Sequence, residues 1–68
     1  MKWLLKKYMV EAHIDSMAEL ARQIGMTRRA LYDRISEPQT FRVFEIAALD
    51  EILHFTDEDL TRLIRGQV

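Results

Sequence analysis

The sequence predicts an all-α fold: a compact domain of five short helices organised around a central helix-turn-helix. Apolar residues recur three and four positions apart along most of the 68-residue chain, which is the spacing of an α-helix. Residues that cap or end helices separate these stretches. No stretch alternates apolar and polar residues over the length of a strand. We take residues 1–68 as a single domain, because a chain of this length supports one small core.

The central pair of helices lies within residues 16–35, and its first helix has a start and an end signal. Ser16 can cap this helix, and Glu19 stands three residues later, the spacing of a capping box. Ile24 lies on the inward face. Gly25 follows where the helix should end, because glycine adopts the left-handed conformation at little steric cost.

The second helix of the pair is expected over residues 27–36. Thr27 can cap it, and Leu31 and Ile35 are four apart, so they share an inward face. The stretch between Ile24 and Leu31 is too short for an antiparallel hairpin. The two helices must therefore cross steeply, as in a helix-turn-helix.

Three further helices are expected around this pair, over residues 2–12, 43–54 and 56–66. Their inward residues are expected to be Leu5, Tyr8 and Met9; Ile46, Leu49 and Leu53; and Leu60, Leu63 and Ile64. Pro38 lacks the amide proton of a helix interior, so residues 37–42 should form a loop anchored by Phe41. Thr56 can cap the last helix.

Composition excludes several classes of protein. The chain has no cysteine, so it forms no disulfide and no thiolate metal site. His13 and His54 lack the spacing of a helical metal pair, and we expect no metal, no cofactor and no catalytic activity. No apolar run approaches the ~20 residues of a membrane span, and charge begins at Lys2. We therefore expect a cytoplasmic protein.

Charge is unevenly distributed along the chain, although the net charge is only −1. Residues 1–42 hold eight Lys and Arg and five Asp and Glu, a net charge of +3. Residues 43–68 hold two Arg and six acids, a net charge of −4. A basic half that carries the helix-turn-helix could face a polyanion. Mixed surface charge on an ordinary helical domain is the alternative.

The residues of the central pair resemble those of the lambda-type repressor and Cro family of phage and prophage regulators. The matching residues are Leu20-Ala21, Ile24-Gly25-Met26 and Leu31. The resemblance implies a DNA-binding domain that regulates transcription and binds double-stranded DNA as a homodimer. Two positions depart from the family pattern: Met17 stands where the family often has a phosphate-binding glutamine, and Ile35 is the last inward residue.

The outward face of the second helix carries the candidate DNA-reading residues. The resemblance places base contacts in the first two turns of this helix, at Thr27, Arg28, Arg29, Tyr32 and Asp33. An arginine can donate two hydrogen bonds to a guanine edge, and an aspartate can accept one from cytosine. The interpretation we prefer for Asp33 is that it pairs with Arg29, four residues before it. The alternative for the whole face is an ordinary solvated surface.

Two further sets of residues complete the prediction. Candidate phosphate contacts are Arg34, Arg42, Lys6 and Arg22, although Arg34 could instead pair with Glu37. A second row on the fourth helix, Phe44 and Ala48 followed by Phe55, predicts a dimer interface. Phe55 could instead pack under the fifth helix. These apolar residues also leave open an alternative function, a helix-turn-helix scaffold for protein association such as an anti-repressor or assembly adaptor.

Overall fold

The structure, a computed structural model, describes residues 1–66 and confirms the predicted fold of five helices. In chain order the helices are α1 (Lys2–Glu11), α2 (Met17–Gln23), α3 (Arg28–Ser36), the 3₁₀ turn η1 (Pro38–Thr40), α4 (Val43–Leu53) and α5 (Asp57–Arg65). Residues 1–66 contain no strand. Within the same range, no helix is long and apolar enough to cross a membrane.

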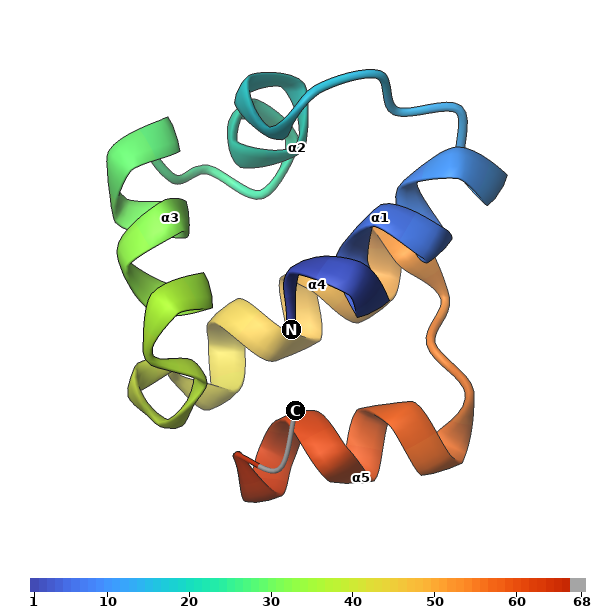
Figure 1. Ribbon diagram of the computed structural model, residues 1–68, viewed down its shortest axis with the longest axis vertical. Helices are drawn as coiled ribbons and strands as arrows, with labels where there is room; N and C mark the ends of the chain where they lie inside the picture. The colour runs from blue at the N-terminus through green and yellow to red at the C-terminus, as the bar shows by residue number, and fades with distance from the viewer. Residues whose placement is uncertain (67–68) are drawn as a thin grey trace.

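The helices pack around one core, with α1 lying in front of α4 and packed against it (Figure 1). The α2–α3 pair lies at one side of these two helices and α5 lies at the other (Figure 1). The Cα atoms span 25 × 23 × 19 Å. The core has a fully buried leucine from each helix, namely Leu5, Leu20, Leu31, Leu49 and Leu63. This arrangement holds the α2–α3 pair against a common scaffold.

The predicted N-caps of α2, α3 and α5 are confirmed. The hydroxyls of Ser16, Thr27 and Thr56 each accept a hydrogen bond from the backbone N–H three residues later, at 3.1, 3.1 and 3.2 Å. The capping box of α2 is only half formed, and that part of the prediction is wrong. The Glu19 carboxylate binds the Arg22 guanidinium instead of the backbone N–H of Ser16.

Four residues at helix ends, two glycines and two histidines, have backbone φ angles in the left-handed region. Gly25, predicted to end α2, has φ +76°, and Gly66 at the end of α5 has φ +68°. His13 and His54 have φ values of 58° and 55° just after α1 and α4. This conformation is uncommon for a residue with a side chain. It turns the chain sharply after α4, so that Phe55 re-enters the core.

Most of the predicted core is confirmed, with one error on α5. Phe41, the predicted loop anchor, is buried beside η1. Ile64 was expected to face inward but is 61% exposed. Leu63 is fully buried and Leu60 is half-buried, so they carry the inner face of this helix. Ile64 therefore adds an apolar side chain to the surface.

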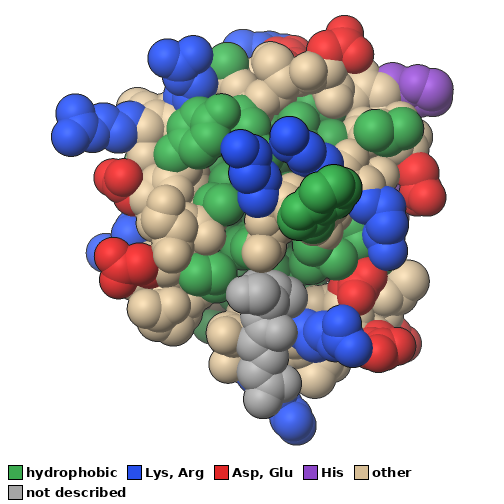
Figure 2. Space-filling model, viewed as in Figure 1, with side chains coloured by type: hydrophobic (Ala, Val, Ile, Leu, Met, Phe, Trp, Pro, Cys, Tyr) green, Lys and Arg blue, Asp and Glu red, His purple; other side chains and the backbone are tan. Residues whose placement is uncertain are grey.

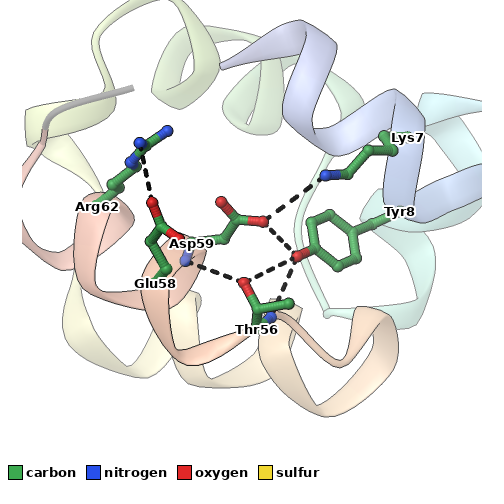
Figure 3. Close-up of polar contacts among 6 residues, drawn as sticks. All are labelled: Lys7, Tyr8, Thr56, Glu58, Asp59 and Arg62. Carbon is green, nitrogen blue, oxygen red and sulfur yellow. Dashed lines mark hydrogen bonds and ion pairs between the residues drawn. The ribbon is translucent and has the colours of Figure 1, made fainter.

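A polar network joins α1 to the start of α5 (Figure 3). The Tyr8 hydroxyl donates a hydrogen bond to the Asp59 carboxylate and accepts one from the Thr56 N–H at 3.1 Å. The Tyr8 ring packs edge-on against the Phe55 ring, with centroids 4.8 Å apart. The hydrogen bond from Tyr8 lowers the pKa of Asp59, and the nearby Lys7 ammonium adds to the effect.

Candidate nucleic-acid interface

The turn between α2 and α3 fixes how α3 is presented. Residues 24–27 connect the two helices, which cross steeply (Figure 1). The Met26 N–H donates to the Ala21 carbonyl at 2.9 Å and closes the turn after Gly25. Leu31 is completely buried and anchors the inner side of α3. The opposite side of α3 must therefore face solvent.

The outer face of α3, defined as Arg28, Arg29, Tyr32 and Asp33, lies in solvent as predicted. Tyr32 is 42% exposed. Within residues 1–66, none of these four side chains makes an ion pair or a hydrogen bond. The interpretation that Asp33 pairs with Arg29 is therefore wrong for this structure. Thr27 is exposed too, but its hydroxyl oxygen caps α3.

Arg34 has a structural role that the sequence analysis missed. Its Nε lies 3.1 Å from Oε1 of Glu45 on α4, and this glutamate is 7% exposed. The same carboxylate oxygen accepts the Arg42 N–H at 2.8 Å, which caps the start of α4. The alternative pair with Glu37 does not fit this geometry, because the Nε of Arg34 is bound to Glu45. The pair with Glu37 is therefore wrong, because Arg34 holds α3 to α4 through Glu45, whereas the phosphate contact stays a prediction for the other guanidinium nitrogens.

Arg22 also has a partner within the protein. Its guanidinium donates to both carboxylate oxygens of Glu19, one of them at 2.7 Å. This bond lowers the pKa of Glu19 and raises that of Arg22. The pair lies on the solvent side of α2, so Arg22 is accessible. Its charge is largely balanced by Glu19, which weakens the predicted phosphate contact.

Lys6 and Arg42 are the remaining predicted phosphate contacts, and both are exposed. Lys6 lies with Lys2 and Tyr32 around a hollow of about 450 Å³, which places α1 cations beside the outer face of α3. Arg42 follows η1, on the chain segment that leaves α3. Lys6 therefore extends the positive surface beside α3, and Arg42 adds an exposed cation after η1.

The predicted dimer residues do not form one exposed row. Phe44 is 66% exposed and Ala48 is half-buried, but Phe55 is 8% exposed and packs on Tyr8. The assignment of Phe55 to an interface is therefore wrong. Its alternative role, packing beneath the last helix, fits the structure. Val43 and Ile64 are 78% and 61% exposed, and they border a hollow of about 160 Å³ between α4 and α5.

Fold and surface together define a class: a small five-helix domain with a helix-turn-helix whose outer face carries arginines that have no acidic partner within residues 1–66. Comparison with protein-family models, curated proteins and solved structures finds no match to this chain. Its function must therefore be argued from its own residues.

The sequence analysis assigned no role to Glu45, which binds Arg34 and caps the start of α4. Its place in the sequence nevertheless indicates the capping role. It is the third residue of α4, the position from which an acidic side chain reaches back to the N-cap amide. That signal identifies the cap with Arg42. It does not identify the partner Arg34, because this contact depends on how α3 packs against α4.

Proposed function

We propose that this chain binds double-stranded DNA sequence-specifically, with α3 in the major groove, and regulates transcription as a repressor of the phage type. The supporting observation is the pair of exposed arginines, Arg28 and Arg29, in the first turn of α3. Neither has an acidic partner within residues 1–66. A protein with this role works in the cytoplasm, on the nucleoid.

The chemistry of this face suits base recognition. A guanidinium presents parallel N–H donors that match the O6 and N7 acceptors of guanine. Tyr32 offers an apolar ring and a hydroxyl, which can contact a thymine methyl group and a phosphate. Asp33, without an arginine partner, is free to accept a hydrogen bond from a cytosine amine. All of these groups are carried by one rigid helix.

The test begins with in-vitro selection of a duplex site, followed by titration of the labelled site. Arg29→Ala should lower affinity for that site by about 1–3 kcal/mol and relax preference at one base pair. Arg62→Ala is the matched control, because Arg62 is an exposed arginine on α5 that pairs with Glu58 at 3.1 Å. Equal affinity of both variants for the selected site would contradict the assignment of α3.

Phosphate contacts have a separate signature. Arg42→Ala and Lys6→Ala should weaken binding to selected and random duplexes alike. Each should reduce the slope of log K against log salt by about 0.9. A variant that changes only the preference for one base pair would move its residue from the phosphate set to the base-reading set.

We also propose that the protein binds DNA as a homodimer through an apolar surface of α4 and α5 made by Val43, Phe44 and Ile64. These side chains are 78%, 66% and 61% exposed. Contact of apolar surface with water is unfavourable, and a symmetric contact between two copies would bury it. Sedimentation at micromolar concentration should show a dimer that Phe44→Asp converts to monomer. A monomer both with and without the selected DNA would reject the dimer.

The same apolar surface favours a second function, a helix-turn-helix scaffold that associates with proteins. The net charge of −1 and the net −4 of residues 43–68 agree with this alternative. Titration with random duplex DNA at several salt concentrations discriminates between the two. A scaffold shows no salt-dependent binding, whereas a DNA-binding protein does.

A further inference from the structure

The outer surface of α1 carries apolar side chains that the proposed DNA interface does not use. Trp3 is 88% exposed and Val10 is 75% exposed, although both lie on a helix whose inner side is fully packed. With Leu4, Lys6 and Lys7 they line a hollow of about 590 Å³. Figure 2 looks onto the molecule from the side of α1 and shows green apolar side chains beside blue cationic ones. We name this surface the α1 groove.

The spacing of the apolar residues suits a helical partner. Trp3 and Val10 are seven residues apart, so they lie on one side of α1, about 10 Å apart along its axis. A partner helix repeats its own apolar side chains at the same interval of two turns. Tryptophan is among the side chains that contribute most to binding when a partner covers them. The groove therefore offers two anchor points at a spacing that a helix can match.

The charge around the α1 groove indicates the sign of the charge that a partner should carry. Lys2 and Lys6 are exposed and have no acidic partner within residues 1–66. Lys7 lies 3.9 Å from Asp59, and its side chain is 63% exposed. The α1 groove thus combines exposed apolar side chains with lysines beside them. Acidic residues flanking the apolar face of a partner helix would complement it.

Other occupants fit this surface less well. A symmetric contact between two copies would bring the lysines together, and like charges repel. A membrane surface gains little here, because two unpaired lysines add only about 2 kcal/mol of attraction to anionic lipid. A DNA backbone would find the lysines but would leave Trp3 and Val10 without an apolar contact. An acidic amphipathic helix satisfies both features.

We propose that the α1 groove is a docking site for an acidic amphipathic helix of another protein. The site shares Lys6 with the proposed phosphate contacts, and Lys6 and Val10 also line the hollow beside Tyr32, but docking at Trp3 does not depend on DNA binding. A regulator with both surfaces would bind its operator with α3 and hold a protein partner with α1.

The experiment uses the full chain and two synthetic helical peptides. Both carry leucines at seven-residue spacing; one has glutamates flanking the leucines and the other has lysines there. Trp3 is the only tryptophan, so its fluorescence reports directly on the groove. The acidic peptide should shift the emission to the blue with a micromolar dissociation constant that weakens with salt. The lysine peptide should have no effect.

Variants test the two features separately, with binding followed by calorimetry where Trp3 is replaced. Trp3→Ser and Val10→Ser should each weaken the acidic peptide about tenfold or more, and Lys6→Gln should weaken it a few-fold. Ala18→Ser is the control, because Ala18 is an exposed apolar residue on α2, outside the α1 groove, and should change nothing. Unchanged far-UV circular dichroism shows that each variant is folded.

Four results would overturn the proposal. The first is a failure of the acidic peptide to bind, and the second is equal binding of both peptides. The third is a shift of Trp3 emission that is stronger with phosphatidylglycerol vesicles or duplex DNA than with the acidic peptide. The fourth is a shift that follows protein concentration without peptide, which would assign the groove to a second copy.

Discussion

Two regions of this small domain treat their polar side chains in opposite ways. On the outer face of α3, Arg28, Arg29 and Asp33 have no partner within residues 1–66. At the junction of α1 and α5, Tyr8 and Asp59 bind each other, and the tyrosine oxygen also accepts the backbone N–H that precedes α5. The junction satisfies its polar groups internally, whereas the α3 face leaves them available.

This difference separates charges that hold the fold from charges that can meet a partner. Arg34 and Arg29 lie on the same helix, five residues apart, yet only Arg34 is committed to the fold through Glu45. A count of arginines would treat them alike. Substitutions in the two regions should therefore affect different measurements, stability in one case and binding in the other.

The largest expected contrast is between the two sides of α3. Leu31→Ala should cost about 2–5 kcal/mol of unfolding free energy, because Leu31 is completely buried and its loss leaves a cavity. Tyr32→Ala, one residue later on the exposed side, should change stability by no more than about 0.5 kcal/mol. Urea unfolding followed by far-UV circular dichroism measures both. Similar losses for the two variants would mean that the outer face of α3 is part of the core.

The next effect concerns the ion pair that joins α3 to α4. Glu45→Ala should lower the unfolding free energy by about 1–3 kcal/mol, because it removes the partner of Arg34 and the acceptor for the Arg42 N–H. Glu51→Ala is the control, since Glu51 lies exposed on the same helix. If both glutamates tolerate alanine equally, solvent satisfies Arg34, and the pair does not fix α3.

A smaller effect depends on pH and tests the α1–α5 junction. The hydrogen bond from Tyr8 lowers the folded-state pKa of Asp59 below the usual value of 3.8, with further lowering from Thr56 and Lys7. The ionised carboxylate therefore adds stability above about pH 4, and this stability is lost as pH falls through the lowered pKa. Asp59→Asn should cost about 1.5 kcal/mol at neutral pH and progressively less in acid.

Thermal unfolding of the wild type and Asp59→Asn between neutral and acid pH measures this difference. Asp57→Asn serves as the control, because Asp57 is an exposed acid at the start of the same helix. The difference in melting temperature between wild type and Asp59→Asn should shrink in acid. If it stays constant down to strongly acid pH, the charge of the carboxylate is not what stabilises the junction.

Local signals predicted most of the fold, because they depend on residues close together in the sequence. Ser16, Thr27 and Thr56 each cap a helix through an amide three residues away, and Gly25 ends α2 through its own backbone. The all-helical architecture followed from such features together with apolar spacing. Helix limits agree with the prediction to within one or two residues.

Contacts between distant segments account for most of the errors, although the half-formed capping box has a local cause, the pair of Glu19 with Arg22. Arg34 and Glu45 are eleven residues apart, and Tyr8 and Asp59 are fifty-one apart, so spacing along one helix cannot reveal either pair. Phe55 is buried and Ile64 is exposed, the reverse of the expectation, because the packing of α5 against the other helices decides which of its sides is covered. The α3 face was easier to predict, because an outward residue needs no partner.

The smallest expected effect on stability belongs to neither of the two regions. It concerns the exposed pair of Arg22 and Glu19 on α2. Arg22→Ala should leave the free energy of unfolding almost unchanged, because solvent replaces an exposed ion pair three residues apart. For DNA binding the informative substitution is Glu19→Gln. It keeps Arg22 and removes the negative charge that now pairs with it. If Arg22 lies near the phosphates, Glu19→Gln should raise affinity for random duplex and steepen the salt dependence by less than one unit, while Arg22→Ala should lower affinity, because it leaves the Glu19 carboxylate without a partner beside the phosphates. If Glu19→Gln has no effect on the salt slope, α2 lies away from the backbone, and the positive surface around α3 is limited to Lys6 and Arg42.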